Sequence, residues 1–244
     1  MGKLKGILKI TGEYDGLLFY ELNGQIVVRK KTGFEGKGIK TKANYVRTRE
    51  NASEFGRVSV IGKRLRMELY PFLKKIHTPY LHNYVLKQFL EIMRCDILSE
   101  RGKRTVTMGL QTEEGRKLLQ GFEFNKNVPL SSVVVSKFEV LAEEGQLVFP
   151  DLKKGDIRFP EYGSHIALEL VVLWFDAETE MFSLVKGERV VLPKPGFEPE
   201  VSLAVDMNQG SGLSIVLLFA EFLQEVNEEL LGLEGCSLTV VGTD

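Results

Sequence analysis

The beginning of the chain has the pattern of short β-strands separated by tight turns. In residues 3–10 lysines alternate with apolar residues or glycine, as in a half-buried strand. The following stretch, LLFYELNGQIVVRKK, places two runs of β-forming residues around Asn23-Gly24. Asn-Gly favours a type I′ hairpin, because both central residues of that turn need positive φ. We therefore predict an N-terminal β-meander, with its first two strands joined through residues 12–16.

A helical period replaces this alternation from Asn51 onward. Asn51 and Glu54 resemble a capping box, with Asn in place of the usual Ser or Thr. The apolar residues that recur at spacings of three, four or seven are Phe55, Val58, Leu65, Leu69, Phe72 and Ile76. We predict a helix over about residues 51–76, which Pro71 should kink or end near Tyr70.

A second helix is predicted over residues 79–98, with Thr78 as the N-cap and Pro79 in the first helical position. The charged sequence SERGKR follows as a turn over residues 99–104. A short third helix is predicted from Thr112 to Gln120, because Thr112 is a good cap and two glutamates fill the first turn.

From Phe122 onward, short apolar runs alternate with turn-like clusters. Their spacing is typical of an antiparallel sandwich or barrel. Residues 212–232 are compatible with a strand or a helix, and we favour a long strand through about Val226 with a turn at Asn227. The predicted fold is α+β: an N-terminal β-meander and hairpin with two main helices, then a C-terminal antiparallel β-sandwich.

Charge is distributed unevenly over this predicted organisation. Residues 1–104 contain 22 Lys/Arg and 10 Asp/Glu, a net of +12, whereas residues 105–244 contain 10 and 23, a net of −13. We therefore divide the chain into a basic N-terminal part, residues 1–125, and an acidic β-rich part, residues 126–244, which could share one core. Such asymmetry points to a polyanion partner for the basic part, or to attraction between the two parts.

The basic charge is densest in a Gly-punctuated arm over residues 29–50 and continues onto the predicted first helix. Lys and Arg neutralise phosphates, and aromatic groups between them can stack on bases. The candidate polyanion-binding residues are Arg29, Lys30, Lys31, Phe34, Lys37, Lys40, Lys42, Tyr45, Arg47, Arg49, Lys63, Arg64 and Arg66. Residues 33–41, GFEGKGIKT, do not form a Walker loop, because two of its four fixed positions are wrong.

Other chemistry has weaker support in the sequence. His77, His82 and His165 are scattered and CxxC does not occur, so we predict neither a metal site nor a cofactor. Ser164 and His165 are neighbours at the start of a predicted strand, where side chains alternate between faces, so we do not expect them to meet. We predict no catalytic residues and expect a protein that is not an enzyme.

The only two cysteines are far apart in sequence, and we expect free thiols in a reducing, cytoplasmic setting rather than a disulfide. No apolar run is long enough for a membrane span, and the N-terminus reads as a strand rather than a signal peptide. We expect a binding or assembly protein whose first candidate partner is nucleic acid. The alternative is an acidic protein surface, including that of a second copy in a homo-oligomer.

Overall fold

The chain divides into two compact units, of which the first ends at Arg49 and the second begins at Glu50. The parts of the chain that the computed structural model describes are residues 2–3, 10–31 and 36–244. The long helix α2 (Val46–Glu68) contains the boundary, so it begins in the first unit and continues into the second. The most basic stretch of the sequence therefore belongs largely to a unit with its own internal contacts.

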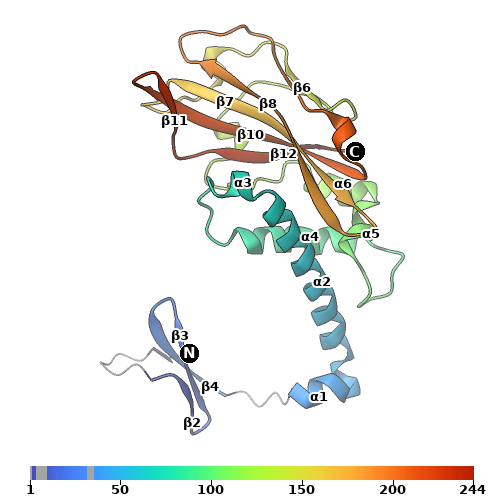
Figure 1. Cartoon of the computed structure of the whole chain (residues 1–244). Helices are drawn as coiled ribbons and strands as arrows, with labels where there is room; N and C mark the ends of the chain where they lie inside the picture. The colour runs from blue at the N-terminus through green and yellow to red at the C-terminus, as the bar shows by residue number, and fades with distance from the viewer. Residues whose placement is uncertain (1, 4–9, 32–35) are drawn as a thin grey trace. The chain divides into compact units, whose positions relative to one another are not determined.

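The first unit contains a small antiparallel sheet with the strand order β1-β4-β3-β2 (Figure 1). Its strands are β1 (Gly2–Lys3), β2 (Gly12–Tyr14), β3 (Leu17–Leu22) and β4 (Gln25–Lys30). Asn23 and Gly24 join β3 to β4 with φ angles of 51° and 76°, which confirms the predicted hairpin. Asp15 and Gly16 alone join β2 to β3, a shorter link than predicted. Most of the strand predicted over residues 3–10 lies outside the described residues.

Arg29 and Lys30 of the basic arm end β4, and the arm from residue 36 onward is helical rather than irregular. It forms α1 (Gly36–Thr41), the 3₁₀ turn η1 (Ala43–Tyr45) and the first turn of α2. The helix therefore begins before Asn51, and the predicted capping box is wrong. Asn51 Oδ1 instead accepts a hydrogen bond from Arg101 at 3.0 Å, and Glu54 binds Arg104. The Asn51 and Glu54 side chains, which resembled a local cap, therefore bind two distant arginines instead.

A proline and a residue with positive φ mark the boundaries of the next helices. Helix α2 ends at Glu68, and α3 (Tyr70–Leu73) carries Pro71 in its first turn, as predicted. The second main helix, α4 (Leu81–Arg94), is shorter than predicted and is preceded by Tyr80 in the left-handed region, with φ 61°. Thr78 is therefore not its N-cap, and its hydroxyl contacts the Asn125 side-chain oxygen at 3.0 Å.

Two short helices complete the helical layer. The predicted third helix is confirmed as α6 (Glu113–Leu119), and Thr112 caps it by accepting a hydrogen bond from the Gly115 N–H at 3.0 Å. Helix α5 (Val106–Leu110) was not predicted, although Thr105 caps it in the same way. Its five residues are too few to show a clear apolar period.

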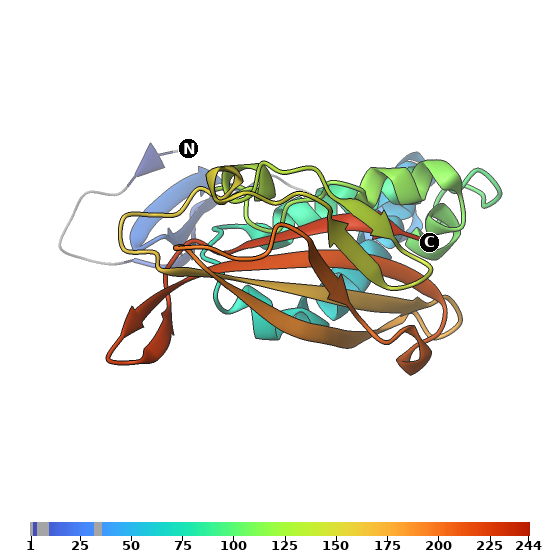
Figure 2. The same ribbon diagram turned by 90° about the horizontal axis from the view of Figure 1, so that it is seen from above.

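The second unit is organised around a five-stranded antiparallel sheet that curls into a half-barrel (Figures 1 and 2). Its strands are β7 (His165–Asp176), β8 (Met181–Pro193), β10 (Leu213–Val226), β11 (Glu229–Gly232) and β12 (Ser237–Thr243). One edge of β10 pairs with β7, and the other pairs with β12 and then with β11. The predicted long strand to Val226 and the turn at Asn227 are confirmed.

Both faces of the strands β7 and β10 are covered, which explains why these two strands read as nearly continuous apolar runs. Residues such as Leu173 and Leu217 face the helices, where they pack with Val58, Leu65 and Phe89. Alternate residues of the same strands face a second cluster on the other side of the sheet. The core with the helices also contains residues from both sides of position 125, including Leu119 and Val171.

The second face is covered by long connections and a small three-stranded sheet, so this part is not a clear sandwich. The small sheet consists of β5 (Glu139–Leu141), β6 (Gln146–Phe149) and β9 (Val201–Ala204). Three 3₁₀ turns lie in the connections, namely η2 (Leu130–Ser132), η3 (Lys154–Asp156) and η4 (Met207–Gln209). Periodicity predicted the strands, but it contains no information on which of them pair.

Among the described residues, every helix is too short or too polar to cross a bilayer.

Candidate nucleic-acid interface

The first three candidate residues lie at the end of β4 and directly after it. Successive side chains of a strand point to opposite faces, so these residues are divided between the two faces of the small sheet. Arg29 lies on one face, with its guanidinium carbon 5.8 Å from the centre of the Tyr20 ring. Lys30 is exposed on the opposite face, directly across from Leu17. Lys31 Nζ pairs with Glu13 at 2.6 Å on the surface, so part of its charge is already matched within the unit.

The helical segment after β4 supplies a second group of cations. Lys40, Lys42 and Arg47 are exposed. Arg49 has an internal role, because its Nη1 donates hydrogen bonds to the carbonyl oxygens of Ile39 at 2.7 Å and Lys42 at 3.0 Å. This guanidinium fastens the start of α2 to α1 and is a poorer phosphate ligand than its sequence position suggested.

Tyr45, Phe34 and Lys37 complete the candidates of the basic arm. Tyr45 is half-buried in η1 and has a contact partner. Phe34 and the side chain of Lys37 lie outside the described residues.

The three candidates on α2 belong to the second unit, and two of them are used within it. Arg64 Nη1 donates to the Glu180 carbonyl at 2.9 Å and lies 3.6 Å from its carboxylate. Arg66 donates to the Gly62 carbonyl at 2.8 Å, and burial lowers the pKa of its guanidinium. Lys63 is exposed. Internal contacts thus remove much of the predicted α2 patch.

Sequence reasoning missed the aromatic residues that lie among the cations of the small sheet. Tyr20 stacks against Arg29, and Tyr14 is 76% exposed on β2. The signal was available in the hairpin: given the Asn-Gly turn, Tyr20 pairs with Val27 and is the diagonal neighbour of Arg29. Arg over an aromatic ring is a favourable arrangement and is also one that nucleic-acid-binding surfaces use.

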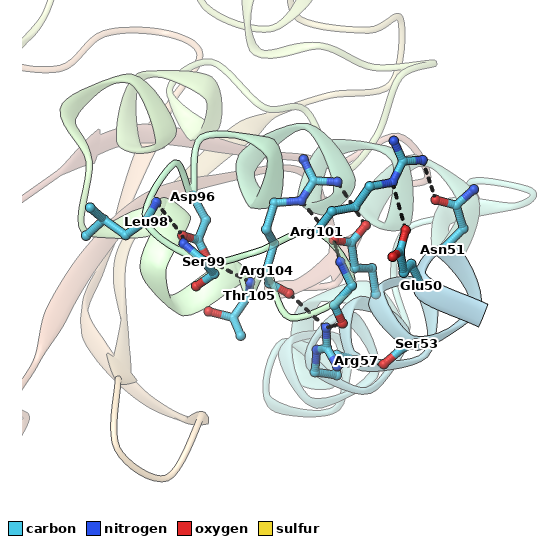
Figure 3. Close-up of polar contacts among 12 residues, drawn as sticks. Glu50, Asn51, Ser53, Arg57, Asp96, Leu98, Ser99, Arg101, Arg104 and Thr105 are labelled. Atoms are coloured by element: carbon cyan, nitrogen blue, oxygen red, sulfur yellow. Dashed lines mark hydrogen bonds and ion pairs between the residues drawn. The ribbon is translucent and has the colours of Figure 1, made fainter. Parts of the chain in front are cut away.

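A basic turn in the second unit, residues 99–104, is hydrogen-bonded to α2 (Figure 3). The Glu54 carboxylate binds the Arg104 guanidinium and the Gly102 N–H, all at 2.8–2.9 Å. Arg57 donates to the carbonyl oxygens of the same two residues, Gly102 and Arg104. Asp96 accepts hydrogen bonds from the backbone N–H groups of Leu98, Ser99 and Thr105, at the two ends of the turn. Of the charged side chains of SERGKR, Arg104 thus links the turn to α2, and Arg101 pairs with Glu50 at 3.4 Å.

One geometric prediction about catalysis is wrong. Ser164 Oγ lies 2.9 Å from His165 Nδ1, although side chains of adjacent strand residues should diverge. Ser164 precedes β7, so strand alternation does not apply to it. Its hydroxyl also accepts a hydrogen bond from the Glu225 N–H at 2.8 Å and contacts the Leu223 carbonyl at 3.3 Å. These contacts fasten the end of β10 to the start of β7 and engage the oxygen that a nucleophile would use.

The remaining titratable residues of the described part do not assemble into a metal centre. None of these residues forms a group of three or more His, Cys, Asp or Glu side chains that could hold an ion. Cys95 and Cys236 are free thiols, and burial raises the pKa of Cys236 to about 11. Asp176 accepts hydrogen bonds from its own turn, at Glu178 and Thr179.

Comparison with known proteins gives no match to a family model, to a curated protein or to a solved structure.

Proposed function

We propose that this protein binds nucleic acid without catalysing a reaction, through the exposed cations of its first unit. The observation that carries the proposal is the net positive charge of the first structural unit, which contains the densest part of the basic region. The first unit has eleven Lys/Arg and four Asp/Glu, a net of +7, and the second has 21 and 29, a net of −8. Residues 29–49 of the basic arm therefore belong to a unit of their own and are not a charged loop of the acidic second unit.

The distribution of cations within the first unit supports a polyanion as the ligand. Lys30, Lys40, Lys42 and Arg47 are exposed on a strand, a helix, a connecting residue and the next helix. A chain of phosphates can contact such a series one after another, and counterion release then provides the free energy of binding. Arg29 beside Tyr20 adds a group able to contact both a phosphate and a base.

The test is the salt dependence of binding to a labelled oligonucleotide. The log–log slope of affinity against salt should be about 0.7–0.9 for each phosphate neutralised. Replacing Lys30, Lys40, Lys42 and Arg47 by Ser should lower that slope by roughly 3 and abolish binding at moderate salt. Arg49 is kept, because its removal would damage the link between α1 and α2.

The matched control removes the same charge from the second unit. Lys74, Lys87, Lys137 and Lys154 are exposed there, and their replacement by Ser should leave the slope unchanged. Wild-type protein that shows no binding at low salt would contradict the proposal, as would equal losses in the two quadruple variants.

Assembly is the second candidate function, and the nearly cancelling charges of the two units favour it. The basic unit of one copy would contact the acidic unit of the next, in a head-to-tail arrangement that forms rings or filaments. Light scattering during size exclusion distinguishes the candidates when absorbance is read at two wavelengths. Salt-sensitive oligomers free of nucleic acid would favour assembly, and a monomer at every concentration would reject it.

A cytoplasmic location is part of the same proposal, since both cysteines are free and a reducing compartment keeps them so.

A further inference from the structure

We infer that the ligand of the first unit is single-stranded nucleic acid, whose unpaired bases stack on the sheet face that carries Tyr14. This inference rests on the proposed function and specifies its ligand class. It starts from the register of the small sheet. Tyr14 is directly opposite Leu17, which is directly opposite Lys30, so the three side chains form one row across β2, β3 and β4.

This row joins an aromatic ring to a cation on one exposed surface. Tyr14 is 76% exposed and Leu17 is 37% exposed. Strand neighbours are about 4.8 Å apart, so Tyr14 and Lys30 lie about 10 Å from each other. A base stacked on the tyrosine ring would leave the phosphates that flank it within reach of the long lysine side chain.

A second aromatic ring is accessible beside the first. Phe19 lies on the same face, is half-buried, and is directly opposite Gly12. A Cβ placed on Gly12 would meet nothing within 4 Å, so the space over this position is open. Tyr14 and Phe19 are diagonal neighbours, roughly 7–8 Å apart, which suits two bases splayed across a sheet.

The opposite face of the sheet and the following helix supply further positive charge. Arg29 and Lys31 lie on the other face, and Lys40 and Lys42 follow on and after α1. The strand β2 is at the edge of the sheet, which leaves Tyr14 approachable from the side. The aromatic row lies within the unit that has a net charge of +7. The net charge of the unit, rather than of this face alone, therefore favours a polyanion over a neutral apolar partner, since Glu21 lies on the same face as Lys30.

Duplexes cannot use such a row, because their bases are stacked on one another and present only their edges. A single strand offers the flat face of each base, and stacking on aromatic side chains tolerates any sequence. The expected ligand therefore lacks stable base pairs and has little sequence preference.

The experiment measures anisotropy with three labelled probes, namely an oligothymidylate of about 15 nucleotides, an oligouridylate and a duplex of equal length. Wild-type protein should bind both single strands more tightly than the duplex. Tyr14→Ala should weaken single-strand binding about ten-fold, which is the size of one stacking contact, and leave the salt slope unchanged. Tyr14→Phe keeps the ring and should bind like the wild type. Tyr162→Ala removes a tyrosine that is 66% exposed in the second unit and should have no effect.

The outcomes separate this inference from the proposed function. Binding to neither single strands nor duplex would overturn both. Salt-dependent binding that prefers the duplex, or that Tyr14→Ala leaves unchanged, would overturn only the single-strand inference. An equal loss in Tyr14→Phe would also overturn it, because the ring would then not be the contact. Circular dichroism melts of each variant identify any loss caused by unfolding.

Discussion

The carboxylate of Glu54 binds one edge of the Arg104 guanidinium at two points, with Oε1 at 2.8 Å from Nε and Oε2 at 2.9 Å from Nη2. Glu54 is 3% exposed, and the Gly102 N–H donates to the same carboxylate. This pair connects α2 to the turn that precedes α5 (Figure 3). The geometry is that of a strong, two-point, charge-assisted interaction.

Glu54→Gln should therefore reduce the free energy of unfolding by about 3 kcal/mol, because the Arg104 charge would remain without a counterion at a mostly buried site. Urea unfolding followed by circular dichroism measures the change. Glu113→Gln is the control, since it breaks an exposed pair with Lys117 and should cost less than about 0.5 kcal/mol. Equal losses of unfolding free energy in the two variants would show that the buried pair contributes no more to stability than the exposed pair.

Stability should fall as the solution becomes acidic. The hydrogen bond from Arg104 holds the pKa of Glu54 below its ordinary value of 4.5. Burial raises the pKa of Asp96, but the N–H groups of Ser99, Thr105 and Leu98 outweigh this effect and bring it below 3.8. Since the folded-state pKa values are the lower ones, their stabilisation is complete above pH 4.5 and disappears as the pH falls through them.

Urea midpoints measured between about pH 3 and pH 6 test this linkage. The wild-type midpoint should decline on the acid side, and Glu54→Gln should decline less steeply. An identical dependence of the urea midpoint on pH in Glu54→Gln and in the wild type would mean that Glu54 does not titrate as described.

Two glycines should respond to alanine in opposite directions. A Cβ on Gly109 would lie 2.1 Å from the Ile92 carbonyl oxygen, so Gly109→Ala must separate α5 from α4 and should cost about 1–3 kcal/mol. A Cβ on Gly56, in the interior of α2, would meet nothing within 4 Å. Gly56→Ala should add about 0.5–1 kcal/mol through helix propensity. Thermal melts of both variants decide the signs, and stabilisation by Gly109→Ala would contradict the close helix packing.

The two thiols should react at very different rates. Cys236 is 2% exposed, its Sγ donates to the Lys75 carbonyl at 3.3 Å, and burial raises its pKa to about 11. Cys95 is partly exposed. Alkylation followed by mass spectrometry should label Cys95 first, and Cys236 only when urea unfolds the chain. Cys95→Ser isolates the second thiol, and rapid native labelling of that variant would be inconsistent with its burial.

Local patterns predicted the elements whose causes are local. The Asn23-Gly24 hairpin, the break at Pro71 and the cap at Thr112 each depend on residues within one turn of chain. The start of α2 was misplaced because Glu54, which resembled half of a capping box, binds Arg104 fifty residues away. A partner at that distance leaves no trace in the periodicity of a helix.

The same distinction holds for the candidate interface. Lys40, Lys42 and Arg47 were predicted as exposed cations, and they are exposed. Arg64 was not expected to be occupied, because its partner Glu180 lies in a hairpin 116 residues further along the chain. Counting charges finds a basic segment, but only the fold decides which guanidinium groups remain available to a ligand.

The position of β12 has a consequence for synthesis on the ribosome. Its residues Leu238 and Val240 pack among the helices and bond to residues 122–124, which precede them by more than a hundred positions. When α2 to α6 have left the ribosome, the strand β12, against which they pack, has therefore not yet been synthesised. Until β12 emerges, part of the apolar surface of these helices stays exposed to solvent. Folding of the second unit should thus be completed only after β12 has been synthesised.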